Sequence, residues 1–377
     1  MKKIQMVDLK GQYEKIKDTV NSSVLEVIDT TAFINGPEVH SFQKELEDYL
    51  GVKNVIPCAN GTDALQIAMM GLDLKPGDEV ITADFTFAAT VEVIALLQLT
   101  PVLVDVEPDT FNFDPEAIKR AITPKTKAIV PVHLFGQTAN MDAIMEIAQE
   151  HNLYVIEDNA QAIGANYHFK DGSTKKAGVI GDVASTSFFP SKNLGCYGDG
   201  GAIFTNNDQL AHTIRGIVNH GMYERYHHDV VGVNSRLDSI QAAVLRAKLP
   251  KLNKYNQARQ EAANKYSKAF ENFEQITTPF TAGEKDTHVY HQYTIKIADG
   301  KRDALAKHLG EKGIPFGIYY PIPLHSQKAY RDDRYREEDF PVTNQLVKEV
   351  ISLPMHTELD DEQIDYITST IKEFLKK

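Results

Sequence analysis

Lys192 stands in the segment SFFPSKNLGCYGDGG (187–201), between an apolar run and a glycine-rich turn. A lysine held at the edge of a sheet in this way can act as a nucleophile and form a Schiff base with a carbonyl compound. Most lysines on loops are simply solvated surface residues. The interpretation of Lys192 therefore depends on the groups that the fold would bring around it.

Other segments supply groups that a cofactor with a pyridine ring and a phosphate would need. Asp158 ends the run LYVIED (153–158), where a carboxylate would keep a pyridine nitrogen protonated. Gly61 and Thr62 lie at a strand-to-helix turn, where main-chain N–H groups and the helix dipole favour an anion. Ser187 adds a second hydroxyl, and Phe87 could lie flat against the ring.

Each of these residues alone also has a structural explanation. Asp158 could cap a helix that starts around Ala160, and Gly61-Thr62 could be an ordinary capping turn. Taken together with Lys192, however, the set indicates an enzyme in which pyridoxal 5'-phosphate (PLP) is bound to the lysine.

The elements that must position these residues alternate between short apolar strands and helical patterns. We expect strands at 53–59, 78–84, 101–106, 127–134, 153–158, 184–189 and 201–205. Strands this uniformly apolar, separated by helices, predict an α/β fold with a mostly parallel sheet covered on both faces. Ligands bind such sheets at the carboxyl ends of the strands, and Lys192 and its candidate partners follow strand ends.

The pattern changes from about Asp238. A long amphipathic helical stretch (239–270) is interrupted by Pro250, and it is followed by a predicted strand at 288–297 and helices at 303–313 and 364–377. This predicts a smaller α+β domain. We place the domains at 1–250 and 251–377.

The overall composition excludes several classes of protein. With 377 residues and a net charge of −12, the chain is an unsuitable partner for nucleic acid. No apolar run approaches the length of a membrane span. Only two cysteines, Cys58 and Cys196, are present, which predicts reduced packing residues in a soluble cytoplasmic protein.

Several segments together resemble the DegT/StrS family of PLP-dependent sugar aminotransferases, and the similarity extends along essentially the whole chain. These segments are INGPEV (34–39), CANGTDAL (58–65), PVHLFGQTANMDAI (131–144), EDNAQAIGA (157–165), SFFPSKNLGCYGDGGAIFT (187–205), GVNSRLDSIQAA (232–243), YYPIPLHSQ (319–327) and SLPMH (352–356). The resemblance implies the PLP-dependent aspartate aminotransferase-like fold (fold type I).

The resemblance also implies a role for each candidate residue. Lys192 would be the Schiff-base lysine and proton shuttle, Asp158 would pair with the pyridine nitrogen, and Gln161 would reach the ring hydroxyl. The remaining cofactor contacts would be Gly61, Thr62 and Ser187 at the phosphate, Phe87 on the ring, and Asn234 from the neighbouring subunit of an obligate homodimer. The family pattern EDAAQ reads EDNAQ here, and the substitution at Asn159 leaves Asp158 and Gln161 in register.

Within the family the chain is most similar to enzymes that aminate C3 of UDP-2-acetamido-2-deoxy-3-oxo-glucuronate, with L-glutamate as donor, for bacterial polysaccharides. A uronate needs a cation, and Arg236 and His325 are candidates. Tyr319 and Tyr320 could contact the sugar or the nucleotide. Alternatively, Arg236 forms an ion pair at the dimer interface and the tyrosines only pack.

Two rival functions stay open at this point. The acceptor could be a dTDP-linked 3- or 4-keto-6-deoxysugar, or the chain could be a non-catalytic regulator with a PLP fold. Such regulators usually add a DNA-binding segment, for which we find no room before the catalytic domain. The pair His227-His228 lacks a carboxylate or cysteine spacing that would complete a metal site, so we expect no metal.

Overall fold

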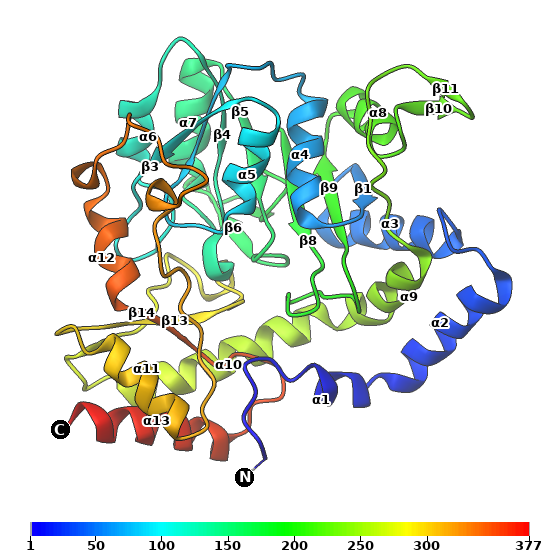
Figure 1. Cartoon of the computed structure of the whole chain (residues 1–377). Coiled ribbons are helices and arrows are strands. Elements are labelled where there is room, and N and C mark those ends of the chain that lie inside the picture. Colours follow the sequence, from blue (N-terminus) through cyan, green and yellow to red (C-terminus); the bar gives the residue numbers. More distant parts are fainter. Residues whose placement is uncertain (1, 377) are drawn as a thin grey trace.

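The computed structural model describes residues 2–376, so Met1 and Lys377, the outer limits of the two predicted domains, lie outside the described residues. Its main sheet has seven strands in the order β1-β9-β8-β5-β4-β2-β3 (Figure 1). The strands are β1 (Asn54–Cys58), β2 (Glu79–Ala83), β3 (Thr100–Val104), β4 (Thr126–Val130), β5 (Tyr154–Asp158), β8 (Val183–Ser187) and β9 (Gly201–Thr205). Each overlaps a segment for which the sequence predicts a strand.

The sheet is mostly parallel, which confirms the predicted α/β class. Strands β3, β2, β4, β5 and β8 pair in parallel, whereas β9 is antiparallel to both β8 and β1. Because two antiparallel pairings separate them, β1 points the same way as β8. The carboxyl ends of β1, β2, β5 and β8 therefore lie at one edge of the sheet.

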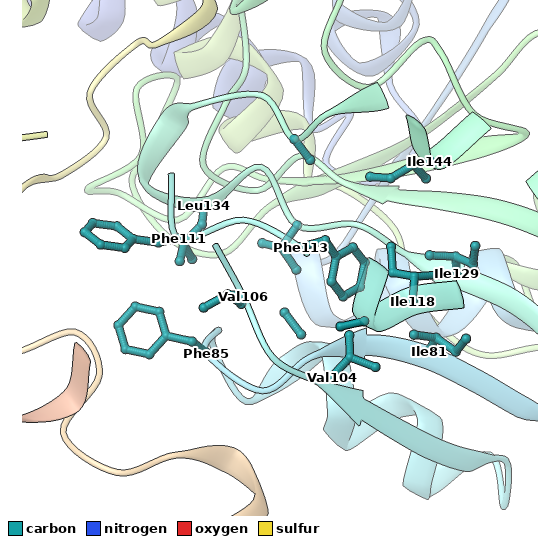
Figure 2. Close-up of a cluster of buried hydrophobic side chains, with 14 of the residues drawn as sticks. Ile81, Phe85, Val104, Val106, Phe111, Phe113, Ile118, Ile129, Leu134 and Ile144 are labelled. Carbon is teal, nitrogen blue, oxygen red and sulfur yellow. The ribbon is translucent and has the colours of Figure 1, made fainter. Parts of the chain in front are cut away.

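Helices cover both faces of this sheet, because successive residues of a strand point to opposite sides. Ile156 packs into a cluster with α4 (Gly61–Gly71), α5 (Ala89–Leu96) and α8 (Asp208–Ile217). The adjacent Val155 packs on the other face with α6 (Pro115–Ala121), α7 (Met141–His151) and α12 (Pro341–Glu349). Figure 2 shows this second cluster, in which Phe113 and Ile118 lie beside Ile81 and Ile129 of the sheet.

The same second face continues over β1, β8 and β9, where it is covered by α3 (Pro37–Leu50) and α9 (Ser239–Lys248). Pro250 lies in a short 3-10 turn between α9 and α10 (Leu252–Phe270), so the predicted interruption is confirmed. Leu252 still packs with the cluster beneath β1 and β9.

A smaller unit forms around an antiparallel sheet of β12 (Ile276–Thr277), β13 (Tyr293–Ile297) and β14 (Val350–Leu353). The helices α10, α11 (Arg302–Glu311) and α13 (Asp361–Leu375) pack on it. Ile4, from the beginning of the chain, joins the same core. The division of the chain at residue 250 stays a prediction.

Short elements that the sequence did not predict surround these two units. Helices α1 (Leu9–Glu14) and α2 (Lys17–Thr30) extend along one side, and a hairpin of β10 (Met222–Glu224) and β11 (His227–His228) projects from the body (Figure 1). A second hairpin joins β6 (Asn166–His168) to β7 (Thr174–Lys176).

Three predicted elements differ from the structure. The expected helix near Ala160 is wrong, because residues 160–164 form a turn. The strand expected at 288–297 begins only at Tyr293, since Tyr290 adopts a positive φ of 46°. Strand β4 ends at Val130 rather than at Leu134, and Leu134 is the first residue of a 3-10 turn. None of the helices within residues 2–376 is both long and apolar enough to cross a membrane.

Candidate active site

A cavity of about 670 Å³ lies at the carboxyl ends of the parallel strands. It is lined by residues that follow β1, β2, β5 and β8, so four segments far apart in sequence meet as the sheet geometry predicts. A separate segment, Ile318–Pro321, closes another side of the cavity. The lining includes all of the following candidates: Gly61, Thr62, Phe87, Asp158, Gln161, Ser187, Lys192, Tyr319 and Tyr320.

Lys192 follows β8 in a tight turn, in which its main-chain N–H donates to the carbonyl of Phe189 at 2.8 Å. Its side chain is half-buried and lines the cavity. Burial lowers the pKa of Lys192 to about 8, and the nearby Asp158 carboxylate opposes this shift only in part. A lysine with this pKa is neutral in a large fraction of molecules at slightly alkaline pH, which is what a nucleophile or a general base requires.

Asp158, the last residue of β5, is 5 % exposed, and both of its carboxylate oxygens are oriented by neighbours. Thr90 Oγ1 donates to Oδ2 at 2.9 Å, and the N–H of Ala160 donates to Oδ1 at 3.1 Å. The carboxylate therefore caps a turn rather than a helix while still facing the cavity.

The end of the cavity beside Gly61 (the hollow) lies where the start of α4 packs so closely against β8 that only glycine fits. A Cβ on Gly61 would lie 2.6 Å from Cβ of Ser187, far inside the normal contact distance. Gly61 and Thr62 begin α4, and Asn60 caps this helix by accepting from the N–H of Asp63 at 2.8 Å. The hollow thus combines a helix N-terminus with two hydroxyl side chains, which fits a phosphate group.

Aromatic rings and an amide form the middle of the cavity. Phe87 is 57 % exposed, and its ring centroid lies 6.3 Å from that of Tyr320. Gln161 Nε2 donates to the hydroxyl of Tyr320 at 3.2 Å, while Oε1 accepts from the N–H of Phe135 at 2.6 Å. The hollow beside Gly61 fits the phosphate of PLP, and Asp158 and Phe87 fit its ring. Lys192 lines the same cavity.

Asn234 and Arg236 do not line this cavity. They line a neighbouring pocket of about 430 Å³, and Asp199 borders both spaces. Arg236 Nη1 donates to Asn219 Oδ1 at 3.2 Å, and its buried Nε has no partner within residues 2–376. Arg236 forms no ion pair with another residue of 2–376, and the alternative of an ion pair at a dimer interface stays a prediction.

His325 also lies outside the cavity. It is 6 % exposed, and its Nδ1 donates to Asp84 Oδ2 at 2.7 Å. The structure therefore brings nine of the candidate residues to one cavity and places Asn234, Arg236 and His325 elsewhere. His227 and His228 are exposed on the β10–β11 hairpin, and no cluster of metal-ligating side chains occurs in the described part of the chain.

Sequence reasoning missed His291, which lines the cavity and is 6 % exposed. Its Nδ1 has no hydrogen-bond partner among the described residues. Burial, together with the charges of Lys192 and Arg259, holds the pKa of His291 well below its usual value, so the ring is neutral at pH 7. The only signal in the sequence was a histidine just before a strand, which is also common in cores.

Comparison with known proteins explains this arrangement. Residues 14–372 match the model of the DegT/DnrJ/EryC1/StrS aminotransferase family. The chain belongs to this family. It is therefore an aminotransferase that uses pyridoxal phosphate, and the resemblance inferred from the sequence motifs is confirmed.

Three relatives of this aminotransferase match along nearly their entire length. A UDP-2-acetamido-2-deoxy-3-oxo-D-glucuronate aminotransferase of Pseudomonas aeruginosa is 46% identical, covering 98% of this chain and 99% of the relative. A pleiotropic regulatory protein of Geobacillus stearothermophilus is 44% identical over 99% of both chains. A UDP-N-acetyl-3-dehydro-alpha-D-glucosamine 3-aminotransferase of Acidithiobacillus ferrooxidans is 42% identical over 99% of this chain and 98% of its own.

Solved structures show the same fold. DesV of S. venezuelae superposes with a TM-score of 0.95 at 36% identity and covers all of both chains. The ntda protein of Bacillus subtilis, solved with bound PMP, has a TM-score of 0.89 at 32% identity over 96% of this chain and 82% of that chain. These matches confirm the predicted fold class.

Proposed function

We propose that this aminotransferase moves an amino group from L-glutamate to C3 of UDP-2-acetamido-2-deoxy-3-oxo-glucuronate, as a step in the synthesis of a surface polysaccharide. The observation that carries the proposal is the cavity around Lys192, considered with the 46% identity to an aminotransferase of that name over 98% of the chain. Lys192, Asp158 and the hollow beside Gly61 support the amino transfer, and the relative supports the choice of acceptor.

In this proposal Gly61, Thr62 and Ser187 hold the cofactor phosphate, and Phe87 lies against its ring. Asp158 keeps the pyridine nitrogen protonated, because a buried carboxylate beside a cation favours the charged form of that cation. Gln161 has its Nε2 free to turn from Tyr320 toward the ring hydroxyl, since Oε1 is already held by Phe135. When bound, PLP supplies an electron sink for the bond that breaks at the α-carbon.

Lys192 carries the proton transfers. With the cofactor and the donor bound, the free Nζ of Lys192 would take a proton from the α-carbon of the donor and deliver it to the cofactor. The pKa of about 8 makes the neutral amine available near neutral pH, which a lysine at its reference value of about 10.4 would not. One water would be consumed to release 2-oxoglutarate, with the amino group left on the cofactor. The keto-sugar would then receive that amino group by the reverse path, which returns the water.

A second copy of the chain completes the site in this account. Lys192 and the neutral His291 are the basic side chains among the residues that line the cavity, and no arginine is among them. Glutamate, a uronate and a diphosphate all carry negative charge, so further cations are needed. Arg236 and Asn234 line a pocket that opens beside the cavity, where they are available to a neighbouring subunit.

The surface near that pocket supports a homodimer. Leu25, Ile28, Phe33 and Ile34 are between 41 and 57 % exposed, and an apolar groove of about 670 Å³ runs beside them along α2 and α9. A surface of this kind marks a protein contact. We therefore propose a homodimer that forms through this apolar surface. In it, Asn234 of each subunit would contact the cofactor phosphate of the other subunit, and Arg236 would contact the uronate bound there.

Two further parts of the proposal concern the acceptor and the compartment. Tyr319 and Tyr320, which line the same cavity as Lys192, contact the acceptor sugar or its nucleotide. The enzyme acts in the cytoplasm, because its two cysteines are unpaired and buried, as expected in a reducing compartment.

Turnover assays with defined acceptors test the proposal. Holoenzyme and L-glutamate are incubated with the UDP-3-oxo-uronate, with UDP-3-oxo-N-acetylglucosamine and with dTDP-linked 3- and 4-keto-6-deoxysugars, and amino-sugar products are measured by mass spectrometry. We expect the UDP-uronate to give the highest kcat/KM, and Lys192→Ala to give no product with any acceptor. No turnover of the UDP-uronate by active holoenzyme would contradict the choice of acceptor.

A further inference from the structure

His325 forms a close, two-point contact with a carboxylate 241 residues earlier in the chain. Its main-chain N–H donates to Asp84 Oδ1 at 2.7 Å, and its ring Nδ1 donates to Oδ2 at 2.7 Å. A third bond runs from the N–H of Leu324 to the carbonyl of Asp84 at 3.3 Å. Both side chains are buried, with 6 % of His325 and 1 % of Asp84 exposed.

The surroundings keep this pair in a single arrangement. The imidazole stacks on Phe340, with ring centroids 4.4 Å apart and the planes within 9°. Leu324 and Phe340 pack with Val91 and Leu103 in a small apolar cluster. Charge-assisted hydrogen bonds are strong in such surroundings because water does not compete for them.

A second carboxylate anchors the far end of the same segment. Asp105, just beyond β3, accepts from the N–H groups of Val342 and Thr343 at 2.8 and 2.9 Å, at the start of α12. The chain between these anchors thus lies fixed along the edge of the sheet where β2 and β3 end. Asp84 holds its beginning and Asp105 holds its end.

The Asp84 anchor lies directly behind the cavity wall. Thr86 and Phe87, two and three residues after Asp84, line the cavity, as do Tyr320 and Pro321 before His325. The ring of Tyr320 lies 5.9 Å from that of Phe85 and 6.3 Å from that of Phe87. The two wall segments are therefore joined immediately outside the cavity by the bonds of Leu324 and His325 to Asp84, and inside it by ring contacts of Tyr320.

We infer that Asp84 and His325 form a clamp that positions the Tyr319–Pro321 wall against Phe87 and so sets the shape of the acceptor side of the cavity. His325 is in this view a positioning residue that does not touch the substrate. We expect its influence to fall mainly on the acceptor, because the groups assigned to the cofactor phosphate and the pyridine nitrogen come from the ends of β1, β5 and β8. Of the other cofactor contacts, Phe87 belongs to the clamped wall and Gln161 donates to Tyr320. The description of this side as the acceptor side rests on the proposed function.

Two substitutions of His325 separate the clamp from simple loss of packing. His325→Phe keeps an aromatic ring to stack on Phe340 but removes the Nδ1 donor. His325→Asn places an amide nitrogen near the position of Nδ1 and can still donate to Asp84. Ser326→Ala is the control in the same turn, because it keeps the main-chain bond to Pro323 and removes only the hydroxyl, which donates to the exposed Glu337 at 3.3 Å. The same Glu337 carboxylate lies 3.6 Å from His325 Nε2, and both variants of His325 leave it in place.

The first readout is hydrogen–deuterium exchange of the three holoenzyme variants and the wild type, which needs no substrate. We expect His325→Phe to increase exchange in residues 318–326, and His325→Asn and Ser326→Ala to behave like the wild type. Unchanged exchange of this segment in His325→Phe would overturn the clamp.

The second readout divides the reaction into its halves. In His325→Phe we expect the KM for the keto-sugar to rise roughly tenfold, equivalent to about 1.4 kcal/mol, while conversion of the cofactor by glutamate alone changes less than about twofold. If His325→Phe slowed the glutamate and the keto-sugar half-reactions equally, or lost the absorbance of bound PLP, the assignment of the clamp to the acceptor side would be wrong. If the wild type aminates none of the keto-sugars, the proposed function fails, and the exchange measurement still decides the clamp.

Discussion

At the scale of single residues, burial lowers the pKa of both Lys192 and Lys248 to about 8, but of the two only Lys192 lines the cavity. Removal from water lowers its pKa to about 8 while Asp158 limits the shift, so the amine is reactive yet still has a counter-charge nearby. The neutral His291 lines the same cavity and adds no positive charge at pH 7. Lys192 is therefore the residue lining the cavity whose protonation changes near neutral pH, and the burial that sets its pKa comes from the walls of the cavity.

Gly61→Ala tests the phosphate hollow. The new Cβ would lie 2.6 Å from Cβ of Ser187, so the helix start and β8 must separate. We expect the Kd of PLP for the apoprotein to rise at least tenfold, because a shift of a few tenths of an ångström misaligns every phosphate donor. Absorbance titration of the apoprotein with PLP measures this change.

The control for that variant is Gly310→Ala in α11, where a Cβ meets no atom within 4 Å. Alanine favours a helix over glycine by up to about 1 kcal/mol, so this variant should fold and bind PLP as the wild type does. Equal PLP affinity for Gly61→Ala and wild type would show that the hollow does not hold the phosphate.

The candidate residues that follow predicted strands could be placed from sequence, because parallel strands end at a common edge. Lys192, Asp158 and Gly61 belong to this group. His325 could not be placed, since its environment is created by Asp84, 241 residues away, and by the ring of Phe340. Local sequence carries no information about such a contact.

At the scale of elements, a buried carboxylate fixes the connection between β5 and β8. Glu157 is fully buried, and it accepts hydrogen bonds from the N–H groups of Gly178, Ile180 and Gly181 at 2.7 to 2.8 Å. His133 Nε2 donates to it at 2.9 Å, because the Nδ1 of that ring accepts from Ala139. One side chain thus holds the loop that leads to β8 and Lys192.

Glu157→Gln should destabilise the fold by about 2–4 kcal/mol near pH 7, because an amide NH₂ would face donors in a buried site. Burial alone would raise the pKa of Glu157, but the hydrogen bonds from His133 and from the loop outweigh burial and lower the pKa below its ordinary value of 4.5. The stabilisation is therefore fully present above pH 4.5 and is lost as the pH falls through the folded-state pKa.

Urea denaturation between pH 3.5 and 8 measures the free energy of unfolding of Glu157→Gln and of the wild type. The difference between the two free energies should become smaller in acid. Glu146→Gln, on the exposed side of α7, is the matched control and should change stability by less than about 0.5 kcal/mol. A gap that stays constant across the pH range would contradict the assigned role of the carboxylate.

Elements with a strong pattern were predicted well, and those set by tertiary contacts were not. The apolar run at β9 and the interruption at Pro250 are visible in sequence. The late start of β13 is not visible in the sequence, because it depends on a contact with Gly136. A Cβ on Gly136 would come within 3.0 Å of the main-chain nitrogens of Tyr290 and His291. The short hairpins have too few residues to show a pattern.

At the scale of the whole molecule, we propose that each active site is shared between two chains. The cavity residues of one chain provide the lysine and the phosphate hollow, whereas Asn234 and Arg236 lie in the adjoining pocket. In a dimer with shared sites, two different inactive chains can restore one another.

Lys192→Ala and Asn234→Asp test this sharing. The first variant lacks the nucleophile, and the second places a carboxylate beside the phosphate, so each alone should be inactive. After unfolding and refolding of a 1:1 mixture, half of the dimers are mixed and each has one intact site. We expect about one quarter of the wild-type activity to return, as random pairing of a C₂ dimer requires. Activity that stays at the level of the separate variants would contradict shared sites.

Covalent labelling tests the central claim most directly. Borohydride reduction of the wild-type holoenzyme should fix the pyridoxyl group on one lysine, and mass spectrometry of the digested protein identifies that lysine. The account predicts the label on Lys192, within the segment between Lys176 and Arg215, and no label when L-glutamate is added before reduction. A label on another lysine, or a Lys192→Ala variant that still aminates a keto-sugar, would contradict it.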